Sequence, residues 1–152
     1  MNEICQATIA RDVAVTGPDE GTLSAVLASA DRLRERLEAS LVGVGLSISK
    51  FDAMDQLIAA DQPLTLGDLA GRLHCVRSNI TQLVDRLESE GLVKRGSCPD
   101  DRRAVRAMVT PEGRERHAAG VDAIRSVQAE LGGRLESAER RHLIQLLSAL
   151  NG

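Results

Sequence analysis

The sequence predicts a mainly α-helical fold with one small β-hairpin, and three observations lead to this prediction. Good helix formers, such as leucine, alanine, arginine and glutamate, dominate the 152 residues. Apolar residues recur at helical spacing over most of the chain. One segment past the middle has turn residues between β-branched stretches, which is typical of a hairpin. Because Phe51 is the only aromatic residue, aliphatic side chains must fill the core.

The N-terminal part predicts an extension followed by two helices. Residues 1–18 show no clear period and end in a turn signal, so we expect an extension before a single domain at 19–152. Apolar residues at helical spacing predict the first helix at about 19–42. Ser47 is expected to cap a second helix, and the turn at 61–63 is expected to end it.

Two short helices are expected next. Thr65 and Asp68 resemble a capping box, with aspartate in the usual place of glutamate or glutamine. The next helix is expected at about 76–90, ended by Gly91, with polar side chains opposite an apolar face. That apolar face comprises Val76, Ile80, Leu83, Val84 and Leu87. Two short helices joined by a tight turn, the second of them polar outward, indicate a helix-turn-helix.

The hairpin follows directly and carries much of the positive charge. The turn sequence Gly-Ser-Cys-Pro-Asp-Asp lies between two β-branched stretches, so this hairpin would form a wing beside the helix-turn-helix. Residues 71–106 contain eight lysines and arginines against five acids, a local charge of +3 in a chain of net charge −3. A basic segment in an acidic protein points to a polyanionic partner, although a solvated charged face is the alternative.

The C-terminal part predicts two more helices. Thr110 is expected to cap a long helix with Pro111 in its first position. Its apolar stripe would comprise Val121, Ile124, Gln128, Leu131 and Leu135, with a weak point at Gly132 and Gly133. Ser137 is expected to cap the last helix. Leu143, Leu146, Leu147 and Leu150 would share one face of it.

Several classes of protein are not expected. Three cysteines without a CxxC motif indicate a reducing cytoplasm, and the N-terminus does not resemble a signal peptide. No apolar run approaches the roughly 20 residues of a membrane span. His74, His117 and His142 are scattered, so neither a metal site nor a cofactor is expected. No nucleophile with a base and an orienting acid is recognisable, so an enzyme is not expected.

Three stretches between Leu64 and Arg114 resemble the MarR (multiple-antibiotic-resistance regulator) family of bacterial transcription factors. They are LTLGDLAGRL, NITQLVDRLESEGLVKR and PDDRRAVRAMVTPEGR. The resemblance implies a winged helix-turn-helix at about 47–110 and dimerisation helices at about 19–42 and 111–150. It also implies a homodimer that binds a pseudo-palindromic operator in double-stranded DNA. Such regulators usually repress nearby genes, and many release DNA when a small-molecule effector binds.

The resemblance assigns DNA contacts to the recognition helix and to the wing. The helix candidates are Arg77, Ser78, Asn79, Thr81, Gln82 and Arg86. Arg102 and Arg103 match the wing arginines of the family, and Asp101 matches the acid that orients them. Arginine reads guanine well, asparagine and glutamine suit adenine, and free N–H groups at the helix start can meet a phosphate.

The roles of three further residues are less sharply defined by the sequence. Lys94 and Arg95 could contact phosphates or simply be solvated strand residues. Asp85 is expected to orient an arginine, because a carboxylate near phosphates is repelled unless it is paired.

Other readings stay open. A redox-responsive regulator could use Cys75 at the start of the recognition helix or Cys98 at the wing tip. Cys5 lies too far upstream to match the reactive cysteine of peroxide-sensing relatives. A winged helix could also be a dimerisation or protein-interaction module without DNA binding. An effector cleft would be lined by the first, second and fifth helices and would be aliphatic apart from Phe51.

Overall fold

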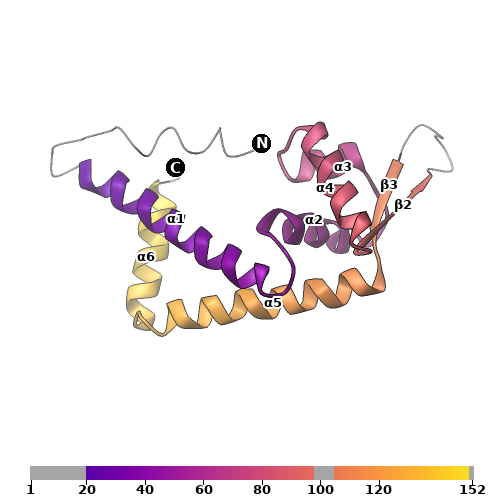
Figure 1. Ribbon diagram of the computed structural model, residues 1–152. Coiled ribbons are helices and arrows are strands. Elements are labelled where there is room, and N and C mark those ends of the chain that lie inside the picture. The colour runs from indigo at the N-terminus through magenta and orange to yellow at the C-terminus, as the bar shows by residue number, and fades with distance from the viewer. Residues whose placement is uncertain (1–19, 98–104, 151–152) are drawn as a thin grey trace. The chain divides into compact units, whose positions relative to one another are not determined.

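The computed structural model describes residues 20–97 and 105–150, and it confirms a mainly helical fold with one small sheet (Figure 1). The chain divides into two compact units, one ending at Leu37 and the other starting at Glu38. The expected extension, 1–18, lies outside the described residues. The helices are α1 (Glu20–Val42), α2 (Ile48–Ala59), α3 (Leu66–Arg72), α4 (Arg77–Ser89), α5 (Pro111–Gly132) and α6 (Ser137–Leu150). Within the described ranges, no helix combines the length and apolar character that crossing a membrane requires.

Side-chain caps set the starts of three helices as the sequence predicted. The Ser47 hydroxyl accepts a hydrogen bond from the backbone N–H three residues on, at the start of α2. Thr65 does the same for α3, and its hydroxyl also donates to the Asp68 carboxylate at 2.8 Å. Thr110 accepts from the Gly113 N–H at 3.0 Å, and Pro111 occupies the first turn of α5. These local bonds satisfy N–H groups that have no partner within a helix.

The turn between α3 and α4 is made by an unusual residue. His74 follows the end of α3 with a φ of 50°, in the left-handed region that favours glycine. The next N–H, from Cys75, donates to the Ala70 carbonyl at 3.0 Å, which closes the last turn of α3. The end of α4 has the same arrangement, but there Gly91 takes the left-handed position with a φ of 74°. The turn therefore requires a left-handed backbone conformation at position 74. A histidine adopts it with backbone strain, which a glycine would not have.

The sheet has three antiparallel strands in the order β1-β3-β2. The expected hairpin is confirmed as β2 (Val93–Ser97) paired with β3 (Val105–Val109). The sequence did not predict β1 (Leu64–Thr65), which pairs with the other edge of β3. Two residues carry too little alternation to be recognised as a strand, and only the pairing with β3 makes them one.

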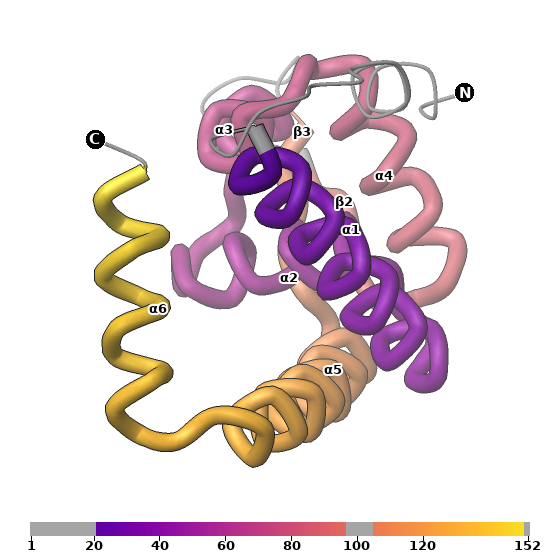
Figure 2. Tube along the Cα trace, turned by 90° about the vertical axis from the view of Figure 1, so that its left-hand side faces the viewer, coloured from indigo at the N-terminus to yellow at the C-terminus, as the bar shows by residue number. Residues whose placement is uncertain are grey.

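Close contact between α5 and the rest of the winged helix depends on two glycines. A Cβ atom at Gly113 would collide with the Leu92 carbonyl oxygen. At Gly120 it would lie 2.8 Å from the Phe51 ring, because α2 packs against α5 (Figure 2). Hydrophobic spacing could not predict these contacts, because glycine has no side chain.

The apolar stripe predicted for α5 is partly wrong. Gln128 is exposed, and the buried residue of that turn is Val127.

Three further expectations about helix ends need correction. Val76, expected on the apolar face, is 63% exposed because it precedes the first turn of α4. The long helix ends at Gly132, so Leu135 is not part of it. Ser137 does not cap α6, because it is already the first helical residue. The backbone N–H of Glu136 donates instead to the Glu139 carboxylate at 2.7 Å.

Candidate nucleic-acid interface

The helix α4 has one side in the core and one side in solvent. Ile80, Val84 and Leu87 are at most 1% exposed, and they fix the rotation of the helix about its axis. The opposite side is polar and exposed, and comprises Ser78, Asn79, Gln82, Asp85 and Arg86, while Arg77 is exposed at the start of the helix. Almost all of these side chains can donate hydrogen bonds. A surface of this kind can read base edges in a major groove, which is about 12 Å wide and admits a helix.

The N-terminal end of α4 lacks the side-chain cap that α2, α3 and α5 have. Its N-cap residue is Val76, whose side chain cannot accept a hydrogen bond. The Val76 carbonyl receives the N–H groups of Asn79 and Ile80, at 3.1 and 3.4 Å. The N–H groups of Arg77 and Ser78 precede these, and they carry the positive end of the helix dipole. This end of the helix is therefore suited to an anionic partner such as a phosphate.

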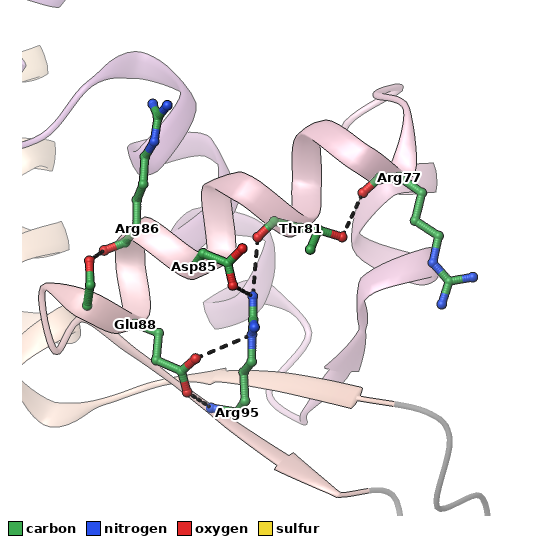
Figure 3. Close-up of polar contacts among 7 residues, drawn as sticks. Arg77, Thr81, Asp85, Arg86, Glu88 and Arg95 are labelled. Atoms are coloured by element: carbon green, nitrogen blue, oxygen red, sulfur yellow. Dashed lines mark hydrogen bonds and ion pairs between the residues drawn. The ribbon is translucent and has the colours of Figure 1, made fainter.

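Arg95 of β2 is bonded to α4 at three positions, which Figure 3 shows together. Its Nη2 atom lies 2.5 Å from the Asp85 carboxylate and donates to the Thr81 carbonyl at 3.2 Å. Its Nε lies 3.4 Å from the Glu88 carboxylate, which also accepts the Arg95 backbone N–H at 3.0 Å. Asp85 is thus paired with an arginine, as expected from its sequence position. The guanidinium groups of Arg77 and Arg86 point away from this cluster (Figure 3).

Of the predicted helix residues, Ser78, Asn79, Gln82 and Arg86 lie on the exposed side of α4, and Arg77 is exposed at its first position. Thr81 differs, because it is half-buried and its hydroxyl donates to the Arg77 carbonyl at 3.0 Å. Its donor is therefore engaged within the helix, which makes it a weaker candidate for base contact than Asn79 or Gln82. Cys75 is exposed immediately before α4. Cys98, Asp101, Arg102 and Arg103 lie outside the described residues.

The sequence missed the structural role of Arg95. The sequence did contain an indication of this role. Asp85 and Glu88 lie three residues apart on one side of a predicted helix, and a basic strand follows that helix. A sequence cannot show which strand side chain faces that helix, so Lys94 and Arg95 looked equivalent. In the structure Lys94 is exposed and Arg95 is half-buried.

A second cluster lies between α2 and α5. The Phe51 and His117 rings are stacked, with centroids 4.6 Å apart and planes 11° apart. The Nε2 atom of His117 lies 3.1 Å from the Asp55 carboxylate. Phe51, the only phenylalanine, tyrosine or tryptophan of the chain, is therefore stacked against α5. Among the described residues, no group of histidine, cysteine and acidic side chains is arranged to hold a metal ion.

Comparison with known proteins finds relatives of this winged helix. The model of the MarR family matches residues 46–105. The chain is 25% identical over 154 residues to the HTH-type transcriptional regulator YdgJ of Bacillus subtilis (strain 168), covering 96% of this chain and 93% of YdgJ. It is 32% identical over 102 residues to the HTH-type transcriptional repressor YetL of the same organism, covering 64% of this chain and 61% of YetL.

A solved structure of a DNA-bound repressor has a similar fold. The transcriptional repressor CouR, bound to a 23-mer DNA duplex, superposes with a TM-score of 0.73 at 25% identity. The match covers 85% of this chain and 91% of that chain.

Proposed function

The chain belongs to the MarR family of transcriptional regulators, and we propose that it is a repressor that binds a pseudo-palindromic operator as a homodimer. In this proposal α4 reads base edges in the major groove, and the β2–β3 wing reaches an adjacent minor groove or the phosphates. A small-molecule effector would release the protein from DNA.

The single observation that carries DNA reading is the exposed side of α4. It presents Arg86, an asparagine and a glutamine, with Arg77 exposed at the first position of the helix, while the two carboxylates at 85 and 88 are paired with Arg95. The negative charge that would repel phosphates is therefore compensated within the protein. The start of α4, without a side-chain cap, adds backbone N–H donors at the same end as Arg77.

The dimer is supported by the apolar faces of α1 and α6. On α1, Leu23 and Leu27 are 65% and 41% exposed. No side chain of α6, residues 137–150, is buried in the chain as described. Its large apolar residues at 143, 144, 146, 147 and 150 are all at least 39% exposed. Exposed apolar patches of this kind mark protein–protein contacts, and a second copy would be the simplest cover.

The experiment that tests the proposal is selection of binding sites from random duplex DNA, followed by titration. We expect an enriched site with two related half-sites about ten base pairs apart, because two recognition helices of a dimer enter successive major grooves. Affinity for this site should fall with salt at a log–log slope of roughly −0.9 per phosphate contact. The matched control is a duplex with scrambled half-sites. No enrichment, together with a flat salt dependence, would favour the protein-interaction module instead.

Effector release can be tested separately once the operator is known. A cleft along α2 and α5 would offer aliphatic contacts, since Phe51 is stacked on His117. A thermal-shift screen of small aromatic acids and aliphatic compounds would detect a ligand, because a ligand that binds only the folded state raises its stability. A hit should then lower operator affinity. A compound that stabilises the protein without changing operator affinity would not be an effector.

A further inference from the structure

We propose that Arg95 is a positioning residue for DNA recognition: it sets the orientation of the recognition helix α4 relative to the wing and does not itself contact DNA. This inference rests on the proposed function. The observation behind it is that one guanidinium group lies between β2 and α4 and contacts α4 at three positions along its length (Figure 3).

The three partners of Arg95 share one side of α4. Thr81, Asp85 and Glu88 are spaced four and three residues apart, so they lie above one another on the side that faces β2. The contacts include a hydrogen bond to a carbonyl of the first turns and an ion pair with a carboxylate of the last turn. The backbone N–H of Arg95 adds a fourth contact, to Glu88. A single residue therefore resists both sliding and rotation of α4 against the strand.

The contact is stronger than an ordinary surface ion pair for two reasons. The Arg95 side chain is only 25% exposed, so solvent screens its charge less than that of a freely exposed arginine. The planar guanidinium also makes several directed contacts at once, which a lysine could not reproduce. At the C-terminal end of α4, Lys50 of α2 pairs with Glu90 at 2.5 Å and holds that end against another helix.

Charge balance argues against direct phosphate contact by Arg95. Its single positive charge already faces two carboxylates, at 85 and 88. Removing it would leave both carboxylates unpaired on the helix that has to approach DNA. Lys94, the neighbouring residue on β2, has no ion pair among the residues that the structure describes, and successive strand residues point to opposite faces. Lys94 therefore provides a control that changes the net charge equally at almost the same place.

The test compares Arg95→Gln and Lys94→Gln on the selected operator and on random duplex. Arg95→Gln should reduce the ratio of operator affinity to random-duplex affinity by roughly tenfold, which is a typical effect of removing an interaction between two contacting groups. It should leave the salt dependence of binding unchanged. Lys94→Gln should leave that ratio unchanged. If Arg95→Gln instead lowered both affinities equally and reduced the salt slope, Arg95 would be a phosphate ligand and the inference would be overturned.

A double-mutant cycle separates positioning from general loss of stability. Asp85→Asn should also lower the operator-to-random ratio, and the double variant with Arg95→Gln should be no worse than Arg95→Gln alone. Arg95→Lys should recover only part of the ratio, because lysine retains the charge but not the directed contacts. Additive losses in the cycle would show that Arg95 does not act through Asp85.

Hydrogen exchange provides a readout that does not require DNA. Arg95→Gln should speed amide exchange in peptides covering α4 and β2, whereas Lys94→Gln should leave it as in the wild type. If the wild type bound no DNA, the proposed function would fail, and this exchange comparison would still decide whether Arg95 holds α4 to β2. Equal exchange in both variants would overturn the inference even if operator binding were intact.

Discussion

The helices α4 and α6 have nearly the same length, 13 and 14 residues, but they are packed in opposite ways. In α4 the apolar side chains at 80, 84 and 87 are almost fully buried, and the solvent side is polar. In α6 none of residues 137–150 is buried, and the leucines remain exposed. The chain thus completes the packing of α4 by itself, whereas the described residues leave the apolar face of α6 uncovered.

The largest expected effect is the loss of a core side chain in α4. Leu87 is 0% exposed, so Leu87→Ala should lower the free energy of unfolding by about 3 kcal/mol, through lost burial and an incompletely filled cavity. Chemical denaturation at two protein concentrations should give the same loss. The matched variant Leu147→Ala in α6 should instead show a loss of unfolding free energy that depends on protein concentration. Equal losses at both concentrations for both variants would contradict the contrast between the two helices.

The next effect concerns the assembly of two copies. Leu146→Glu with Leu150→Glu should weaken the dimer by about a hundredfold, because burying unpaired carboxylates in an apolar contact is costly. Light scattering over a dilution series measures this change. Gln145→Glu is the control, since it adds charge to the same helix beside the leucine face. A wild-type mass of one chain at micromolar concentration would sink the dimer proposal.

Substitutions on the exposed side of α4 should affect binding and not folding. Asn79→Ala and Gln82→Ala should each cost about 1–3 kcal/mol on the operator if the residue reads a base, and much less on random DNA. Thermal unfolding should be unchanged, because both side chains are exposed. Gln128→Ala on α5 is a control with a similar polar side chain. If the helix variants weakened both duplexes equally, α4 would contact the backbone alone.

The wing arginines should have a smaller and less selective effect. Arg102 and Arg103 lie outside the described residues, so their assignment to minor groove or phosphate remains a prediction from the sequence. Arg102→Ala and Arg103→Ala should each weaken operator and random DNA by similar factors. Each should also reduce the salt slope by about 0.9, one phosphate contact. Loss of sequence preference in these variants would reverse the roles assigned to wing and helix.

The smallest effect expected is on the pH dependence of stability. Partial burial of the Asp52 carboxyl, together with the nearby charge of Asp55, raises the pKa of Asp52 above its ordinary value of 3.8. Because the folded state then binds this proton more readily than the unfolded state, Asp52 contributes less stability as pH rises from 3.8 through the raised pKa. Asp52→Asn should remove this pH dependence and raise the midpoint temperature of unfolding at pH 7. The increase should be on the order of 1 °C, because solvent screens the repulsion between Asp52 and Asp55. A lower midpoint at pH 7 would contradict it.

Elements defined by local chemistry could be predicted well. The caps at Ser47, Thr65 and Thr110 involve residues at most three positions apart, so the sequence contains all the atoms that make them. The stop at Gly91 depends on one residue that adopts a positive φ without steric cost. The polar face of α4 followed from helical periodicity in the same way.

Contacts between distant segments could not be predicted. The strand β1 exists only through pairing with β3, about forty residues later. The buried side of α5 depends on two glycines that meet a carbonyl and a ring from other elements. At the start of α6 the predicted cap by Ser137 is wrong, because the Glu139 carboxylate accepts the backbone N–H of Glu136, one residue before that serine.

By itself the sequence determined which segments are helices, where the hairpin lies, and which polar side chains α4 presents, because hydrogen bonds and periodicity within a few residues decide these features. Only the tertiary structure decided that Arg95, and not Lys94, meets Asp85 and Glu88. That choice depends on which face of β2 turns toward α4. The face is set by strand register and by the packing of the whole core, which involve residues far apart along the chain.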